Sequence, residues 1–310
     1  MLSRVADAFY WVRRYLERAE HSARVILVHQ RLTLDDPTDA IGLRLLSAIG
    51  EPPAGFGVVS VGTSDAARHR AAIASCVAAA RENARQIREQ ISSEMWEQLN
   101  GLYLAVRDAA PREDDDPGAF MRSIIEGTHL FHGVTEATLS HGEGWHYLQL
   151  GRYIERATTT ALMLEEYFPE PASATAARAN IGEYAEWVGL LRACAAFEPY
   201  CRTYTADVTP ERLIEFLLLN AECPRSVRFA ADRIEDSLRA IARMHGREAN
   251  GRPERFAGRL RAALNFGTID EIMEGDLVRY VASVRKQCTQ IHVALFQTYI
   301  SYPIETALAR

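Results

Sequence analysis

The stretch Phe9-Tyr-Trp-Val-Arg-Arg-Tyr-Leu-Glu-Arg-Ala-Glu-His-Ser-Ala-Arg24 decides the fold class, because a near copy of it stands in the second half of the chain. The copy is Leu148-Gln-Leu-Gly-Arg-Tyr-Ile-Glu-Arg-Ala157. Both stretches space their apolar residues three and four positions apart, as an amphipathic α-helix does. We therefore expect two similar helices, each carrying an Arg-Tyr-x-Glu-Arg set on the face opposite its main apolar stripe.

The charged members of the two sets correspond one to one: Arg14, Glu17 and Arg18 match Arg152, Glu155 and Arg156. Around the first set the polar side also carries other charged residues, so an ordinary solvated face would account for it. The second helix is apolar nearly all round, which is typical of a buried helix. An isolated buried ion costs several kcal/mol, by order of magnitude, so these charges must be paired. Each set has two arginines and one glutamate, which leaves a surplus positive charge to be neutralised.

Three interpretations of the paired sets remain open. In the first, a buried network joins the helices through guanidinium–carboxylate pairs, Glu17 with Arg156 and Glu155 with Arg18. In the second, Arg14 and Arg152 bind an external carboxylate or phosphate group. In the third, Glu17 or Glu155 is a catalytic general base, although no nucleophile or oxyanion-hole loop lies beside either residue in the sequence.

A metal site is suggested by a group of histidines and glutamates, namely His129, His132, Glu136, His141, Glu143 and His146. Carboxylate metal sites in helical bundles use Glu-x-x-His motifs from two helices, and only scattered matches occur here. We therefore expect no metal and no cofactor. His141 is better explained by a capping box from Ser140 to Glu143. We group His141 with the core aromatics Tyr15 and Tyr153 as residues that support the charged sets.

The composition is that of an ordinary soluble globular protein of 310 residues, with 48% hydrophobic and 25% charged residues. A net charge of −6 argues against general nucleic-acid binding. No apolar run approaches the roughly 20 residues of a membrane span, and the start does not resemble a signal peptide. Five cysteines without a C-x-x-C pair favour reduced thiols in the cytoplasm. The absence of a phosphate loop and of a dinucleotide glycine motif argues against ATP hydrolysis by this chain alone.

Helical periodicity recurs along the chain, and it predicts an all-α bundle of about ten or eleven helices. The first expected helix ends at Leu34 and is followed by helices at 40–49 and 64–91, one that begins at Ser93 and one that begins at Asp116. Further helices are expected at 140–168, 176–200, 209–222 and 226–245. A short helix that ends at Asn265 and a last one from a capping box at Thr268 to about Pro303 complete the set. Only the Gly/Pro-rich stretch 50–63 could hold a short strand.

The spacing of the two Arg/Glu sets, close to half the chain, suggests a duplication. We expect a single helical domain, 1–310, with possible halves 1–139 and 140–310 packed through the two similar helices. A third, weaker echo lies at Phe229-Ala-Ala-Asp-Arg-Ile-Glu-Asp236. Asp232 and Asp236 stand there in place of arginines, so they could supply the opposite charge.

Several motifs together resemble the alpha-E domain family of bacterial all-helical proteins with a Glu-Arg motif. They are Arg14-Tyr-Leu-Glu-Arg-Ala-Glu20, Gln90-Ile-Ser-Ser-Glu-Met-Trp-Glu97, His141-Gly-Glu-Gly-Trp145, Gly151-Arg-Tyr-Ile-Glu-Arg-Ala157 and the Phe216–Phe229 stretch containing Pro-Arg-Ser-Val-Arg. The resemblance covers essentially the whole chain.

The family resemblance implies a working context but no activity for the helical protein itself. Members are encoded beside, or fused to, circularly permuted ATP-grasp proteins resembling amide ligases, and transglutaminase-like peptidases often accompany them. We therefore expect a helical partner of an ATP-grasp system that makes or modifies peptide-like amide bonds. The alternatives are an enzyme that acts on such amides through Glu17 or Glu155, and a purely structural scaffold.

Overall fold

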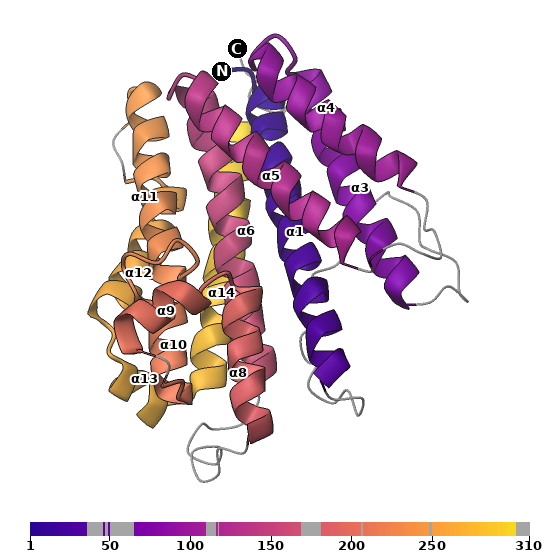
Figure 1. Ribbon diagram of the computed structural model, residues 1–310. Helices are drawn as coiled ribbons and strands as arrows, with labels where there is room; N and C mark the ends of the chain where they lie inside the picture. Colours follow the sequence, from indigo (N-terminus) through magenta and orange to yellow (C-terminus); the bar gives the residue numbers. More distant parts are fainter. Residues whose placement is uncertain are drawn as a thin grey trace.

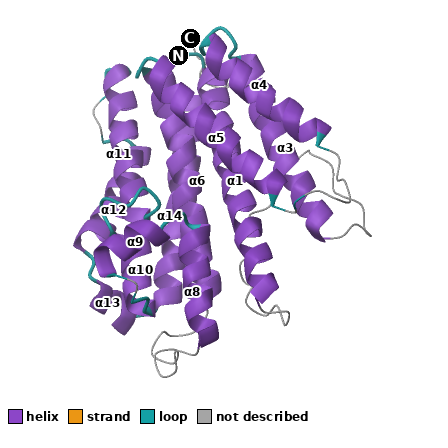
Figure 2. Ribbon diagram, viewed as in Figure 1, coloured by secondary structure: helices purple, strands orange, loops and turns teal. Residues whose placement is uncertain are grey.

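The computed structural model describes residues 1–35, 46, 49, 65–109, 116, 118–168, 181–205, 207–247 and 250–301. The expected helix at 40–49 and the possible strand at 50–63 fall almost wholly outside these residues. Within them the chain forms twelve α-helices and no strand, which confirms the all-α class and exceeds the expected number of helices slightly (Figure 2).

The elements, in chain order, are α1 (Ser3–Asp35), α3 (Asp65–Gln86), α4 (Ser93–Asp108), α5 (Ala119–Thr138), α6 (Glu143–Tyr167), α8 (Ile181–Ala193), α9 (Phe197–Tyr204), α10 (Pro210–Leu219), α11 (Val227–Met244), α12 (Arg252–Phe266), α13 (Ile269–Glu274), α14 (Leu277–Leu295) and a π-helical turn, η1 (Phe296–Ile300). Helices α1 and α6 lie side by side in the middle of the bundle (Figure 1). Helices α3 and α5 pack on α1, and α4 packs on both of these. Helices α11 and α14 pack on α6, and α12 packs on both of these.

Close contact between α1 and α6 depends on Gly151. A Cβ atom built on this residue would lie 2.1 Å from the backbone oxygen of Tyr10, so no larger residue fits without moving a backbone. A Cβ atom built on a second glycine of α6, Gly144, would lie 2.6 Å from a ring carbon of Phe9. Glycine allows this approach because it has no side chain. The two helices that carry the Arg/Glu sets are therefore packed against each other directly.

Helix α1 is buried on its polar side as well as its apolar side, and the expectation of a solvated face around Glu17 is wrong. Arg13, Glu17, Glu20 and His21 are each exposed by less than 5%. The cause lies in the neighbours, because α6, α3 and α5 surround this helix and leave no broad face open to water. The charged residues of α1 belong to the interior of the bundle.

Two of the expected helices differ from the structure in their bounds. The helix expected at 64–91 ends at Gln86, and it is not wholly exposed, because Ile73 and Val77 are buried. The helix expected at 176–200 is broken after α8, where Ala195 has a left-handed backbone with φ 49°. Few non-glycine residues adopt this conformation, so the sequence gives no signal for the break.

Helix starts were predicted with mixed success. The capping box of Thr268 and Glu271 is present, but it opens the six-residue α13, and Asp276 caps a separate α14. The expected capping box at Ser140 is absent, because α6 begins after Gly142 without a side-chain cap. Helix α5 likewise begins after Gly118, whose N–H donates to Asp116. Ser92, Thr209 and Ser226 cap α4, α10 and α11 through their side-chain oxygens.

Candidate functional site

The two Arg/Glu sets lie together inside the bundle and form a larger cluster, which we call the buried ion network. Among the described residues it contains seven arginines and three glutamates: Arg13, Arg14, Arg18, Arg24, Arg152, Arg156 and Arg225 with Glu17, Glu20 and Glu155. They come from α1, from α6 and from the turn that precedes α11. The network therefore has an excess of four positive charges when all ten groups are ionised.

Glu155 of α6 is enclosed by two arginines of α1. Arg14 Nε donates to Glu155 Oε2 at 2.6 Å, and Arg18 donates to both carboxylate oxygens, at 2.5 and 3.2 Å. Burial alone would raise the pKa of Glu155, but the two guanidinium groups outweigh burial and lower it. The expected contact of Glu155 with Arg18 is thus present, and Arg14 joins it.

Glu17 of α1 is enclosed by arginines of α6 and of the turn before α11. Arg156 donates to both of its carboxylate oxygens, at 2.6 and 2.9 Å, and Arg225 donates to Oε1 at 2.9 Å. Burial would raise the pKa of Glu17, but these arginines bring it down to about 2. The expected contact with Arg156 is present as a bidentate pair. The carboxylate is therefore fully ionised and fully engaged at neutral pH.

Glu20, one turn further along α1, connects the network to α5 and to the turn before α11. Its Oε1 accepts from Arg24 at 2.7 Å and from Arg225, and it lies 3.0 Å from His129 Nε2 of α5. Burial opposes ionisation, but Arg225 and His129 bring the pKa of Glu20 well below its ordinary value. Arg225 therefore connects Glu17 and Glu20, and fastens the start of α11 to the middle of α1.

Arg14 is committed to groups inside the protein on both sides of its guanidinium. Besides Glu155 it donates to the hydroxyl of the buried Tyr10 at 2.7 Å. That hydroxyl is also hydrogen-bonded to His292 Nδ1 of α14, at 2.8 Å. Arg14 consequently differs from its counterpart Arg152 and is poorly placed to bind an external anion.

Unlike its counterpart Arg14, Arg152 of α6 makes no hydrogen bond with a described carboxylate of the other helix. Its Nε is buried without a hydrogen bond and lies 3.8 Å from Glu17, whose oxygens are engaged by other arginines. Its Nη1 contacts His132 Nε2 of α5, and its guanidinium lies over the ring of Tyr153. Burial lowers the pKa of Arg152 to about 9, and nearby Arg156 and Arg13 contribute to the decrease. The charge of Arg152 is therefore incompletely balanced.

Arg13 of α1 lies in the same region and is 4% exposed, yet it makes no hydrogen bond or ion pair with any residue that the structure describes. Its guanidinium faces the ring of Phe131 at 6.0 Å. Burial lowers the pKa of Arg13. Burial, with Arg13 and Arg152, also lowers the pKa of His132 to about 2, so this imidazole is neutral. We call Arg13 and Arg152 the surplus arginines.

The chemistry that this arrangement supports is anion binding. Neither Glu17 nor Glu155 is suited to general base catalysis, because each is held ionised by two or more guanidinium groups and has a lowered pKa. Burial raises the pKa of the nearby Cys76 thiol to about 12, which disfavours a nucleophilic thiolate. Two buried guanidinium groups beside a neutral histidine form a set of donors for a carboxylate or phosphate. Arg152 is accessible to solvent, with 12% of its side chain exposed.

Two of the histidines considered for a metal site share a neighbour, because His132 and His141 lie 3.7 and 3.8 Å from Glu136. His129 meets Glu20, His132 meets Arg152, and His141 stacks on Trp145 with ring centroids 4.3 Å apart. Among the residues described, no three His, Cys, Asp or Glu side chains lie together as a metal site would require. His141 is exposed just before α6 and forms no hydrogen bond or ion pair with the described residues of the network.

The remaining predicted residues differ in whether they contact the network. Tyr153 lies beneath Arg152 and Arg156, with 5.2 and 5.5 Å between guanidinium carbons and ring centroid. Tyr15 instead stacks on Trp11. The expectation that Asp232 and Asp236 supply the opposite charge is wrong, because Asp232 pairs with Arg261 and Asp236 lies 3.7 Å from Arg233.

Four residues of the network were missed by the sequence analysis: Arg13, Glu20, Arg24 and Arg225. The first three were assigned to a solvated face, since periodicity cannot show that a third and a fourth helix cover that face. Arg225 lies in the Pro-Arg-Ser-Val stretch that was quoted for the family resemblance, but a turn residue gives no periodic signal. Its position two residues before α11 places it against α1.

Two motif stretches of the sequence also meet at the start of α4 and α6. Residues 89–92 and Ser140, Gly144 and Trp145 line a hollow of about 310 Å³, together with Phe9 and Thr138. Ser92 and Thr138 share a hydrogen bond of 2.8 Å there. This hollow lies at the end of the bundle, away from the surplus arginines.

None of the helices in the described parts of the chain is both long and apolar enough to cross a bilayer. No solved protein structure matches the chain. Among curated proteins, the uncharacterized protein Mb2597 of Mycobacterium bovis is 24% identical over 326 residues, covering 94% of this chain and 35% of the relative. The uncharacterized protein Rv2567 of Mycobacterium tuberculosis matches with the same identity and coverage. The chain thus spans about a third of the length of the curated relatives it matches.

The Alpha-E family is described as a predicted alpha-helical domain with a conserved ER motif, and it matches residues 1–300. The buried ion network contains two Glu-Arg pairs, Glu17-Arg18 and Glu155-Arg156. In both pairs the glutamate and the arginine bond to the other helix, and not to each other. With a match over nearly its full length and an all-α bundle built around these pairs, the chain belongs to the Alpha-E family.

Proposed function

We propose that this protein is an anion-binding helical accessory protein that works beside an ATP-grasp ligase-like protein in making or modifying peptide-like amide bonds. The observation that carries the proposal is the pair of surplus arginines. Arg13 is buried and Arg152 is largely buried, and the described carboxylates leave their positive charges incompletely balanced. Burying an ion without a counter-ion is costly, so an external anion would gain from entering this position.

An accessory role is favoured over independent catalysis by the state of the two candidate bases. Glu17 and Glu155 serve to hold arginines, and removing a proton from a substrate would require one of them to leave its partners. An amide-forming step also needs an activated carboxyl group, and this chain carries no phosphate loop with which to use ATP. The reaction would therefore take place on the partner, with the substrate's anionic group held by this chain.

A second observation agrees with a role beside another protein. In the mycobacterial relatives, the region that corresponds to this chain is about a third of a longer polypeptide. A helical unit that occurs covalently joined to more protein is expected to have neighbours with which it cooperates. We propose that the ATP-grasp protein, and a transglutaminase-like peptidase in some systems, are such neighbours of this chain.

The anion site can be tested on the isolated chain by calorimetric titration with inorganic phosphate and, separately, with acetate as the simplest carboxylate. We expect one of the two anions to bind and the Arg152→Met and Arg13→Met variants to lose at least about 90% of the affinity. Arg85→Met, an exposed substitution on α3, is the matched control and should bind like the wild type. Equal binding by wild type and Arg152→Met would refute the site.

The partnership is tested by co-purification of the chain with an ATP-grasp protein encoded beside it. We expect a stable or salt-sensitive complex, and we expect the ligase reaction of the complex to depend on Arg152. An isolated chain that turns over amide substrates would refute the accessory role, and a partner whose activity is the same with and without this chain would refute the cooperation.

A further inference from the structure

A row of positively charged residues lies on the outside of the molecule, on α12. Arg252, Arg255, Arg259, Ala262 and Phe266 follow one another at intervals of three and four residues, so they form one stripe along the helix. All five are exposed, and Phe266 is 84% exposed, the largest value among the exposed large apolar residues. We call this set the α12 stripe.

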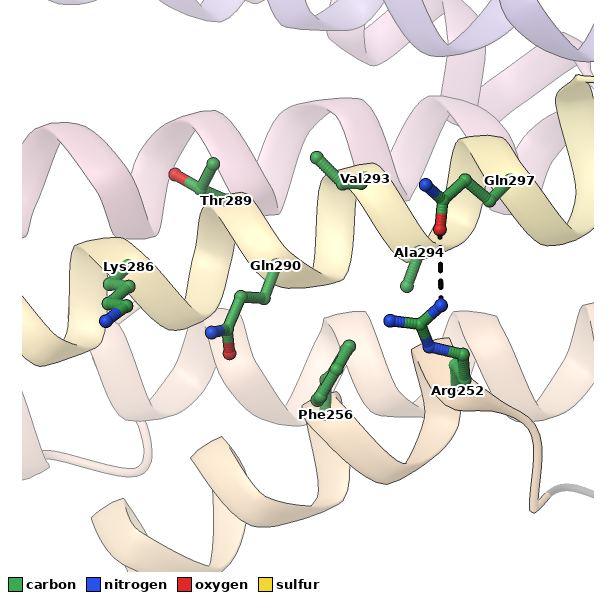
Figure 3. A pocket seen from close by; sticks show the side chains of 8 residues that line it. All are labelled: Arg252, Phe256, Lys286, Thr289, Gln290, Val293, Ala294 and Gln297. Atoms are coloured by element: carbon green, nitrogen blue, oxygen red, sulfur yellow. Dashed lines mark hydrogen bonds between the residues drawn. The ribbon is translucent and has the colours of Figure 1, made fainter.

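The α12 stripe borders a groove between α12 and α14 (Figure 3). A hollow of about 440 Å³ lies between the helices, with Phe256 and Val293 as its apolar walls and Lys286 and Arg252 among its lining residues. A second hollow of about 520 Å³ adjoins it, since Arg252 and Phe256 line both. Both volumes are in the range of ligand-sized sites, and together they form an extended depression.

The charges of this region are of one sign. No acidic residue lines either hollow. Arg252, Arg255, Arg259 and Lys286 form no ion pair with any residue that the structure describes, and Arg252 is tied only loosely to Gln297, at 3.5 Å. The chain as a whole carries a net charge of −6, so a stripe of uncompensated cations departs from its overall character. Such a surface attracts acidic groups.

We propose that the α12–α14 groove binds an acidic amphipathic helix of a partner protein. Carboxylates at the spacing i, i+3, i+7 would face Arg252, Arg255 and Arg259 along the stripe. Apolar side chains further along the same helix would cover Ala262 and Phe266, and apolar side chains beside the carboxylates would enter the hollow next to Phe256 and Val293. This is the helix-in-groove mode of recognition, in which apolar anchors give affinity and charges give orientation.

Other occupants fit the groove less well. A second copy related by a two-fold axis would bring the α12 stripe against itself, with arginine facing arginine. A nucleic acid would require a wider basic surface than one helical stripe on an acidic protein. The proposal stands apart from the anion site, because the surplus arginines lie between α1, α5 and α6 and contribute nothing to this groove.

The test uses the full chain and a short fluorescein-labelled helical peptide with glutamates and leucines on one face, followed by fluorescence anisotropy. We expect saturable binding that weakens as salt is raised. The variant Arg255→Glu/Arg259→Glu should weaken binding at least about tenfold, since it reverses two charges of the stripe. Replacing the peptide's glutamates by glutamines should abolish binding.

The matched control is Arg85→Glu/Arg107→Glu, which changes the net charge equally on α3 and α4, on the other side of the bundle. It should bind the peptide within about twofold of the wild type.

Equal weakening by the two double variants would overturn the proposal, since it would show an effect of net charge alone. Tighter binding of a single-stranded oligonucleotide than of the peptide, or self-association lost in Arg255→Glu/Arg259→Glu, would also overturn it. Phosphate or acetate titration of the same variants should be unchanged, which separates this test from that of the anion site.

Discussion

At the residue scale, two neighbouring arginines of α6 differ in how well their guanidinium groups are hydrogen-bonded. Arg156 gives three hydrogen bonds, two to Glu17 and one to the backbone oxygen of Pro224 at 2.9 Å. Arg152, one turn away, has a buried Nε without a hydrogen bond. Identical side chains thus contribute differently, because the free energy of a buried charge depends on whether its partners are already engaged.

This difference predicts opposite stability effects for two equal substitutions. Arg156→Met should lower the free energy of unfolding by about 3 kcal/mol, since it removes the bidentate partner of a buried carboxylate. Arg152→Met should leave the free energy of unfolding unchanged or raise it, because it removes a buried cation whose pKa is lowered to about 9. Urea unfolding at neutral pH measures both. A large loss of stability in Arg152→Met would show that the surplus arginines are structural.

Ala195 supplies a prediction that is independent of any charge. Its φ of 49° places it in the left-handed region, between α8 and α9. An Ala side chain is strained there and glycine is not, so Ala195→Gly should raise the free energy of unfolding by up to about 1 kcal/mol. Thermal unfolding would show a higher Tm. The control Ala78→Gly, in the middle of α3, should lower the Tm, because glycine is unfavourable in a helix interior.

At the element scale, the contact of α1 with α6 makes the strongest steric demand. Gly151→Ala would place a methyl group 2.1 Å from the backbone oxygen of Tyr10, so the helices would have to separate and disturb the pairs around Glu155. We expect a loss of several kcal/mol or a failure to fold. Gly133→Ala in α5 is the matched control, since its Cβ would meet nothing within 4 Å. That change should stabilise the protein by up to about 1 kcal/mol. Equal stability of the two variants would contradict the close packing.

The elements also show what periodicity can and cannot predict. The apolar spacing of the two similar helices predicted α1 and α6 and their pairing through Glu17 and Glu155, because both follow from local sequence. The burial of Arg13 could not be predicted, since it depends on α5, which is distant in sequence and lies against α1. The division of the last expected helix at Gly275 was missed, because a capping box marks where a helix starts and gives no information on its length.

At the scale of the whole molecule, the three buried carboxylates make stability depend on pH. The pKa values of Glu17, Glu20 and Glu155 are all lowered from an ordinary value of 4.5, that of Glu17 to about 2. A lowered carboxyl pKa stabilises the fold above the ordinary value, and this contribution is lost as pH falls through the folded value. The free energy of unfolding should therefore be steady from neutral pH to about 5 and then fall steeply.

Urea unfolding at a series of pH values between 7 and about 3 measures this dependence. The slope should be shallower in Glu17→Gln, which has one titrating carboxyl fewer. A free energy of unfolding that is unchanged between pH 6 and about 3 would contradict the ionised state of the network. The fold class, the pairing of the two helices and a surplus of positive charge followed from sequence. The size of that surplus did not, because Arg13 is covered by α5 and Arg225 comes from a turn far along the chain.

The connection of Arg225 to Glu17 and Glu20 has a consequence during synthesis on the ribosome. The carboxylates of α1 are made early, but the guanidinium that joins them is translated some 200 residues later. Until then the nascent helix carries ionised groups that keep it hydrated and discourage premature burial against the wrong neighbour. The charged side of α1 would thus be buried only after the turn before α11 has emerged and can dock onto it.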